Sequence, residues 1–170
     1  MNAFLKKYKL FITTLFVLSC TIITLFYNIL KPVKVLPIYQ PAQVNYELVD
    51  STIQHQKKYH RIADFSLINQ NGDTITQEFY KNKIYVADFF FTTCQTICPI
   101  MTDHMYEIQK QTITDPEILL LSHSVTPKID SVAQLKRYAK KKLVNSSKWN
   151  LVTGDKKQIY ELARKSYLAV

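Results

Sequence analysis

Two cysteines, Cys94 and Cys98, are the residues whose type and spacing most clearly suggest chemistry in this sequence. Three residues separate them, and Pro99 follows directly, within the segment Thr-Thr-Cys-Gln-Thr-Ile-Cys-Pro. Two neighbouring thiols can be oxidised to a disulfide and reduced again, and two thiolates can also hold one soft metal ion such as copper(I). The spacing alone leaves both chemistries open.

The position of the pair suggests that the thiols are acidic. A β-branched and aromatic run over 83–91 ends just before them, and Pro99 suits the first turn of a helix, where an N–H group needs no partner. Peptide dipoles at a helix N-terminus stabilise a nearby thiolate. Residues four apart in a regular helix have Cβ atoms ~5–6 Å apart, whereas a disulfide needs ~3.5–4.5 Å. Part of the pair must therefore lie on an irregular loop if a disulfide is to form.

The surrounding sequence predicts an α/β fold with a parallel sheet. An Asn-Gly turn at Asn71-Gly72 between short apolar runs predicts an opening β-hairpin. The segment 83–91 has the composition of a central strand that is buried on both faces. After the cysteines, helices alternate with a strand, which is typical of a parallel α/β core. The expected segments are a helix over about 99–111, a strand over 118–121, a helix over 131–142 and a helix over 156–165.

The first sixty residues are expected to lie outside this core. Residues 10–30 are twenty-one consecutive uncharged and mostly apolar residues. A helix of that length crosses the ~30 Å hydrocarbon layer of a bilayer. We interpret residues 1–9 as a cytoplasmic N-terminus, 10–30 as a transmembrane anchor, 31–61 as a proline-containing linker and 62–170 as the globular domain.

Charges beside the apolar segment predict its orientation. Three lysines precede the segment and two follow it closely. This bias favours a single-pass anchor in the cytoplasmic (inner) membrane, with the globular domain facing the periplasm. The alternative is a cleaved signal peptide or a lipoprotein signal that ends at Cys20. Because the apolar run continues ten residues past Cys20, we favour the retained anchor.

The formal charge of +9 is unevenly distributed and does not predict a nucleic-acid partner. Residues 1–61 hold eight basic and two acidic side chains, 62–127 hold three and eight, and 128–170 hold eleven and three. The segment that contains the cysteines is therefore acidic. The lysines of 136–142 share a helix with an apolar face, and solvated lysines are the default for the opposite face of such a helix.

The segment 93–99 resembles the CxxxCP signature of the Sco (SenC) family, which are thioredoxin-like proteins that assemble a copper site of cytochrome c oxidase. The similarity extends over about residues 62–170. The other similar segments are 65–72, 124–130, and 152–154 with 163–167.

The resemblance implies a thioredoxin-like fold, preceded by the β-hairpin, that binds a copper ion through Cys94, Cys98 and one histidine. It also implies delivery of copper or electrons to the oxidase subunit that holds the binuclear copper A centre. In the family the ligand histidine follows the region similar to Ser166-Tyr167, so the third ligand is expected beyond Val170. The domain is accordingly expected to be incomplete at its C-terminus.

Two internal histidines are weaker candidates for a metal ligand. His104 is expected to point away from the sulfurs, because six helical residues from Cys98 correspond to a rotation of roughly 240°. His123 follows a predicted strand at the sheet edge that carries the cysteines, and we interpret it as a hydrogen-bonded residue at the strand end.

A thiol–disulfide oxidoreductase is the alternative function. In that case Cys94 and Cys98 would be a redox-active pair of a membrane-tethered enzyme that acts on extracytoplasmic protein thiols. The three intervening residues argue against it, since the common redox motif has two. The expected partners are the copper-bearing oxidase subunit, other copper chaperones or thiol reductases, and the membrane through the N-terminal helix.

Overall fold

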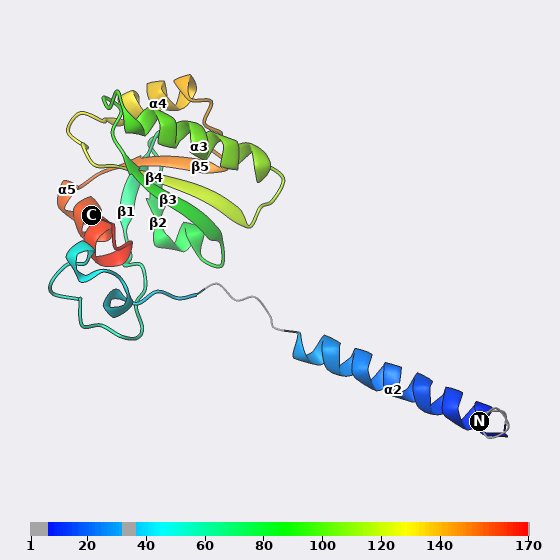
Figure 1. Cartoon of the computed structure of the whole chain (residues 1–170). Coiled ribbons are helices and arrows are strands. Elements are labelled where there is room, and N and C mark those ends of the chain that lie inside the picture. The colour runs from blue at the N-terminus through cyan, green and yellow to red at the C-terminus, as the bar shows by residue number, and fades with distance from the viewer. Residues whose placement is uncertain (1–6, 32–36, 170) are drawn as a thin grey trace. The chain divides into compact units, whose positions relative to one another are not determined.

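The computed structural model describes residues 7–31 and 37–169, and the chain divides after Ile38 into two compact units (Figure 1). The first unit contains one helix, α2, which spans Lys9–Leu30. The second unit, from Tyr39 onward, contains the sheet and the remaining helices.

Helix α2 is long and apolar enough to cross a membrane, with a mean hydropathy of 2.2 and none of its residues buried. Its threonine hydroxyls donate hydrogen bonds within the helix. The hydroxyl of Thr13 donates to Leu10 O at 2.8 Å, and that of Thr24 donates to Cys20 O at 2.7 Å. Hydroxyls bonded to the preceding turn present no free donor to hydrocarbon. The helix is therefore a candidate membrane span.

The second unit is built on a five-stranded sheet with the order β2-β1-β5-β4-β3. Strands β3, β4 and β5 are parallel, and β1 pairs antiparallel with both β2 and β5. The opening hairpin is confirmed, with Gly72 at φ 91° in its turn, a conformation that glycine adopts without strain. The strands are β1 Ser66–Asn69, β2 Thr74–Thr76, β3 Ile84–Phe90, β4 Ile118–Ser124 and β5 Trp149–Thr153.

Among residues 37–169, the segment 83–91, expected as a central strand, forms β3 and pairs with one strand only, β4. Ile84 is 58% exposed, and within β3 only Phe90 is fully buried. The strand buried on both sides is β4, in which Leu120 and Leu121 are 0% exposed. An apolar run shows that both faces of a strand are covered by side chains, but it does not say whether a neighbouring strand lies on each side.

The helices cover both faces of the sheet. Helices α3 (Ile97–Gln111) and α4 (Val132–Lys141) lie together on one face (Figure 1), over a core that includes Phe90, Trp149 and Leu151. Helix α5 (Lys156–Glu161) continues into a π-helical turn over Leu162–Ser166 and packs on a second core. The alternation of strands and helices is therefore confirmed, although the helix expected over 156–165 changes its winding part-way.

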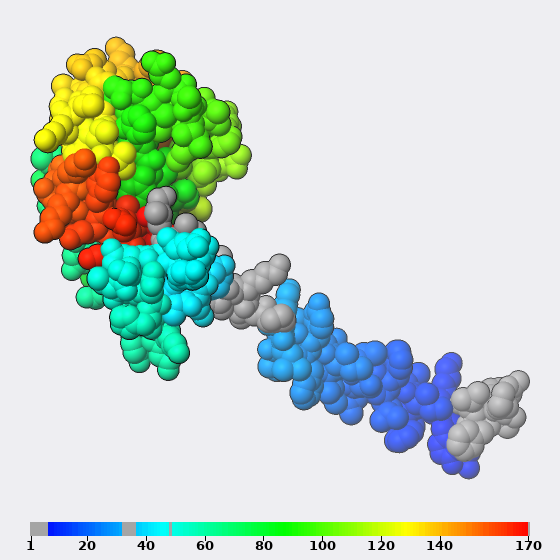
Figure 2. Space-filling model, turned by 60° about the vertical axis from the view of Figure 1, so that its left-hand side comes forward, coloured from blue at the N-terminus to red at the C-terminus, as the bar shows by residue number. Residues whose placement is uncertain are grey.

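Residues 39–61 pack with the globular unit, although we expected a linker over 31–61. His60 Nε2 donates to Ser166 O at 2.8 Å, and the backbone N–H of His60 donates to Gln40 Oε1 at 3.0 Å. Val49 is 5% exposed. Figure 2 shows this segment, in cyan, against the red C-terminal part of the chain. The short 3-10 turns at Pro41–Gln43 and Tyr46–Leu48 have no sustained periodicity, so the sequence pattern resembles that of a linker.

Candidate metal and thiol site

Cys94 and Cys98 lie on the two sides of the boundary between a loop and a helix. Strand β3 ends at Phe90, the chain turns through 91–96, and α3 begins at Ile97. Cys94 is partly exposed on the loop, whereas Cys98 lies in the first helical turn and is 3% exposed. The backbone N–H of Cys98 donates to Cys94 Sγ at 3.4 Å. The expected irregular loop is thus present, and both cysteines are free thiols.

The two thiols have opposite electrostatic environments. Hydrogen bonds from the Cys98 thiol, and from the backbone N–H groups of Cys98 and Thr96, lower the pKa of Cys94 to about 6. Burial raises the pKa of Cys98, and its hydrogen bond to Cys94 adds to this effect. Cys94 is therefore mostly a thiolate near pH 7 while Cys98 keeps its proton. The prediction of two acidic thiols holds for Cys94 alone, because the interior position of Cys98 outweighs the helix N-terminus.

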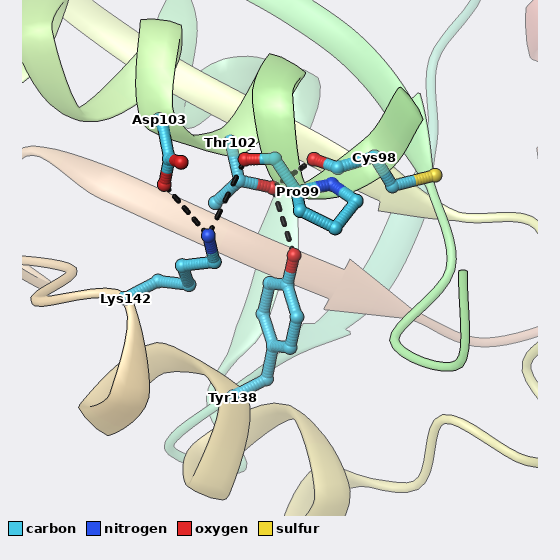
Figure 3. Close-up of polar contacts among 6 residues, drawn as sticks. All are labelled: Cys98, Pro99, Thr102, Asp103, Tyr138 and Lys142. Carbon is cyan, nitrogen blue, oxygen red and sulfur yellow. Dashed lines mark hydrogen bonds and ion pairs between the residues drawn. The ribbon is translucent and has the colours of Figure 1, made fainter. Parts of the chain in front are cut away.

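Helix α4 holds the first turn of α3 in place (Figure 3). Thr102 Oγ1 donates to Cys98 O at 2.8 Å and lies 2.8 Å from the hydroxyl of Tyr138. Lys142 Nζ donates to Pro99 O at 3.3 Å and pairs with Asp103 at 2.6 Å. Two backbone carbonyls of the turn that carries Cys98 are therefore tied, directly or through Thr102, to side chains of another helix. Nothing in the local sequence indicated these contacts.

Replacing Tyr138 with phenylalanine is expected to lower the free energy of unfolding by about 1 kcal/mol, because the variant loses one partly buried hydrogen bond to Thr102. Urea denaturation followed by circular dichroism measures this. Tyr106→Phe is the matched control, since the Tyr106 hydroxyl has no hydrogen-bond partner among the described residues. Equal losses in the two variants would contradict a role for the Tyr138 hydroxyl.

A carboxyl group lies inside the sheet near Cys98. Asp88, on β3, accepts a hydrogen bond from Ser122, and Ser122 Oγ accepts one from Trp149 Nε1 at 2.8 Å. The other carboxylate oxygen, Oδ1, is buried without a partner in the described part of the chain. Burial raises the pKa of Asp88 to about 6. In the sequence, this buried carboxyl is visible as a single acidic residue, Asp88, within the apolar run 83–91.

An apolar groove of about 460 Å³ adjoins Cys98. Phe91, Met101 and Val125 line it from the loop, α3 and the end of β4, and Arg164 is the charged residue in its lining. Ile97 and Ile100 beside the cysteines are 62% and 57% exposed. The surroundings of the thiols therefore offer apolar surface to a partner.

The histidines do not join the cysteines. Among residues 7–31 and 37–169, no three His, Cys, Asp or Glu side chains form a group that could hold a metal ion. His104 is exposed on α3. His123 is 0% exposed and packs on the rings of Phe89 and Tyr167. The backbone of Asp88 lies within hydrogen-bonding reach of the His123 ring, and no group of metal-ligating side chains among the described residues includes this histidine.

The globular unit is similar in sequence to a known protein family. The family model described as SCO1/SenC matches residues 53–170, which is more than half of the chain. The chain belongs to the SCO1/SenC family. The expectation drawn from the cysteine signature is thereby confirmed at the level of the family.

The relatives also support the fold. The SCO1 protein homolog of Bacillus subtilis (strain 168) is 35% identical over 113 residues, which cover 65% of this chain and 58% of the relative. The solved structure of BsSco, a Sco family protein with a disulfide switch, is 35% identical with a TM-score of 0.60 and covers 65% and 66% of the two chains. The fold of this Sco chain is thioredoxin-like, as expected.

Copper is present in some of the similar structures. Arabidopsis thaliana ScoI with copper bound is 28% identical with a TM-score of 0.52, and the match covers 62% of this chain and 65% of that one. BsSco belongs to a family of cytochrome c oxidase assembly proteins. This Sco chain spans somewhat more than half of the length of its B. subtilis relative.

Proposed function

We propose that this Sco chain is a membrane-anchored copper chaperone that binds copper(I) through Cys94 and Cys98 and helps assemble the copper A centre of cytochrome c oxidase. The observation that carries the proposal is the hydrogen-bonded pair of Cys94 and Cys98 at the start of α3, in which Cys94 is ionised at neutral pH. Copper(I) is a soft ion that prefers sulfur ligands, and it is here the cargo.

The two cysteines supply the type of ligand that copper(I) prefers, and the position of a third ligand stays unfilled among the described residues. Two sulfurs from one loop and one helical turn can converge on a single ion, and loading requires only that Cys98 release its proton. No third ligand accompanies them among the described residues. We therefore propose, as the family resemblance implies, that a histidine outside these residues completes the site.

Copper(I) titration of the full chain in detergent, with bathocuproine disulfonate as competitor, tests the proposal. Wild type is expected to bind one copper(I), and Cys94→Ser or Cys98→Ser is expected to weaken binding by at least about a hundredfold, because each removes a direct ligand. Cys20→Ser in α2 is the control and should bind as wild type does. Equal binding by all four proteins would overturn the proposal. In cells, the two site variants should also lower the copper content of the oxidase.

We further propose that the globular unit faces the periplasm, anchored by α2 in the inner membrane. The support is the lysine bias across the apolar segment 10–30, with three lysines shortly before it and two shortly after it. A membrane-impermeant maleimide should label Cys94 in intact spheroplasts. Labelling only after lysis would place the unit on the other side.

Contact with an acidic region of the oxidase subunit fits the charge distribution, since residues 128–170 hold eleven basic and three acidic side chains. Such an association should weaken as ionic strength rises. Binding that is indifferent to salt would contradict it. The apolar surface beside the cysteines would then be the more important contact region.

The second candidate function is thiol–disulfide exchange, and the unequal thiols favour it. The Cys94 thiolate would attack a substrate disulfide to form a mixed disulfide and expel one thiolate. Cys98, after losing its proton, would attack Cys94 and release the second substrate thiol, leaving a Cys94–Cys98 disulfide that a dithiol reductant must reduce. Steady turnover of a model disulfide with a dithiol favours this function, whereas retained copper(I) with negligible turnover favours the chaperone.

A further inference from the structure

The loop that carries Cys94 is anchored at its start by a buried carboxylate. Asp130 is 0% exposed and lies in the turn that precedes α4. The backbone N–H of Thr92 donates to its Oδ2 at 3.2 Å, and Thr92 Oγ1 donates to its Oδ1 at 2.5 Å. Thr92 lies two residues before Cys94, so the bonds act directly on the chain that leads to the thiolate.

The same carboxylate binds a second segment. Ser124 Oγ and Thr126 Oγ1 both donate to Asp130 Oδ2, at 2.5 Å and 3.0 Å. No lysine, arginine or histidine nitrogen forms an ion pair with it in the described chain. A buried carboxylate with several neutral donors is stable only while those donors stay in place. Asp130 thus links the end of β3 to the end of β4.

Helix α4 extends the link. Gln134 Nε2 donates to Thr92 Oγ1 at 2.9 Å, so the Thr92 hydroxyl both gives and receives a hydrogen bond. The β3–β4 ladder ends at the pair Phe90 and Ser124, and Thr92 lies beyond it. Beyond the ladder, the position of the loop therefore depends on side-chain hydrogen bonds, including those of Thr92 with Asp130 and Gln134.

We propose that Asp130 is a positioning residue that sets the place of Cys94 relative to Cys98. Cys94 N–H donates to Phe91 O at 3.2 Å, so the residues from Phe91 to Cys94 form one turn, and Thr92 lies in its middle. When Thr92 is held in place, this turn also holds the Cys94 sulfur in the position where it accepts a hydrogen bond from the backbone N–H of Cys98. The inference rests on the proposed function, because it assigns a role relative to the thiol pair.

Two isosteric variants test the inference with the full chain in detergent. Thr92→Val and Thr126→Val each remove one hydroxyl that bonds to Asp130, and only Thr92 lies on the cysteine loop. The first measurement is the equilibrium with oxidised dithiothreitol, in which the two protein thiols form a disulfide and the reagent's disulfide becomes a dithiol. The second is copper(I) affinity against bathocuproine disulfonate.

Thr92→Val removes the hydroxyl's bonds to Asp130 and Gln134 and is expected to shift the disulfide equilibrium and the copper(I) affinity by at least about fivefold, the equilibrium equivalent of one hydrogen bond. Thr126→Val is expected to shift both by less than twofold. Both should lower the melting temperature, Thr92→Val more than Thr126→Val because it loses two hydrogen bonds and not one, and a merely structural role predicts the same. Thr92→Ser, which keeps the hydroxyl, should restore the wild-type values. A disulfide constant that differs by less than threefold between the two valine variants overturns the inference.

The outcomes separate this inference from the proposed function. If wild type fails to bind copper(I), the chaperone function fails, and the disulfide equilibrium still tests Asp130. If wild type binds copper(I) and the two valine variants behave alike, the positioning role alone fails. If Thr92→Val does not fold, a second pair of variants replaces it. Gln134→Ala removes the hydrogen bond that Gln134 donates to Thr92, and Arg137→Ala removes the exposed side chain that donates to Gln134. A disulfide constant that differs by less than threefold between these two variants then overturns the inference.

Discussion

Asp88→Asn is expected to raise the free energy of unfolding by about 3 kcal/mol at pH 8 and to leave it almost unchanged near pH 3. The Asp88 carboxyl is buried with one oxygen unpartnered, and its pKa is raised from 3.8 to about 6. A shift of about two units corresponds to about 3 kcal/mol. Asparagine keeps an oxygen for the Ser122 hydroxyl and carries no charge that must be desolvated.

The sign follows from proton uptake. Between about pH 4 and pH 6 the unfolded chain releases the Asp88 proton while the folded chain retains it, so the wild type loses stability as the pH rises through this window. Well above pH 6 the folded chain has also released the proton, and the free energy of unfolding does not fall further on account of Asp88. Urea denaturation at several pH values measures the difference between the two proteins. Asp64→Asn, at an exposed position, is the control, and a difference that does not depend on pH would contradict the assignment to Asp88.

Iodoacetamide is expected to modify Cys94 at least tenfold faster than Cys98 in the reduced wild-type protein at pH 6.5. A thiol with a pKa of about 6 is mostly ionised at that pH, whereas a thiol at the ordinary value of 9.0 is ionised to well under 1%. The lower nucleophilicity of the more acidic thiolate reduces this advantage to about tenfold. Because burial raises the pKa of Cys98 and shields its sulfur, the observed ratio should be larger.

Mass spectrometry of the modified peptides resolves the two rates and keeps Cys20 separate. The pH midpoint for Cys94 should lie at about 6 and should move upward in Cys98→Ala, because the largest cause of the lowered pKa is the hydrogen bond from the Cys98 thiol, which alanine cannot replace. Cys94→Ser should remove the fast phase entirely. Comparable rates at the two cysteines, or a midpoint for Cys94 that stays fixed in Cys98→Ala, would show that the pKa values of the thiols are not unequal in this way.

The local features of the fold were predictable from the sequence. The Asn71-Gly72 turn determines the hairpin, and Pro99 marks the first turn of the helix that carries Cys98. These features depend on the conformational preferences of a few adjacent residues. The place of the cysteine pair, between a strand end and a helix start, follows from them.

Features that depend on distant contacts were not predictable. The sequence does not predict strand β5 as a separate element, because the polar residue Asn150 interrupts its apolar run. In the fold, Asn69 and Tyr80 form hydrogen bonds with the Asn150 amide. The edge position of β3 depends on the order in which the strands pair. The contacts of Asp130 with Thr92 join residues thirty-eight positions apart, and no periodicity in the sequence indicates such a bond.

Within residues 37–169 no strand pairs with the outer side of β3, and in this part of the chain Asp88 also bears on self-association. An edge strand exposes a row of backbone groups to which a strand from another molecule can add, and proteins oppose this with charged side chains that point inward from the edge. β3 contains no proline or lysine, and Asp88 is its one charged residue. A foreign strand laid against β3 would desolvate this carboxylate further. In the described part of the chain, the Asp88 charge that lowers the free energy of unfolding at neutral pH therefore also opposes the addition of a foreign strand to β3.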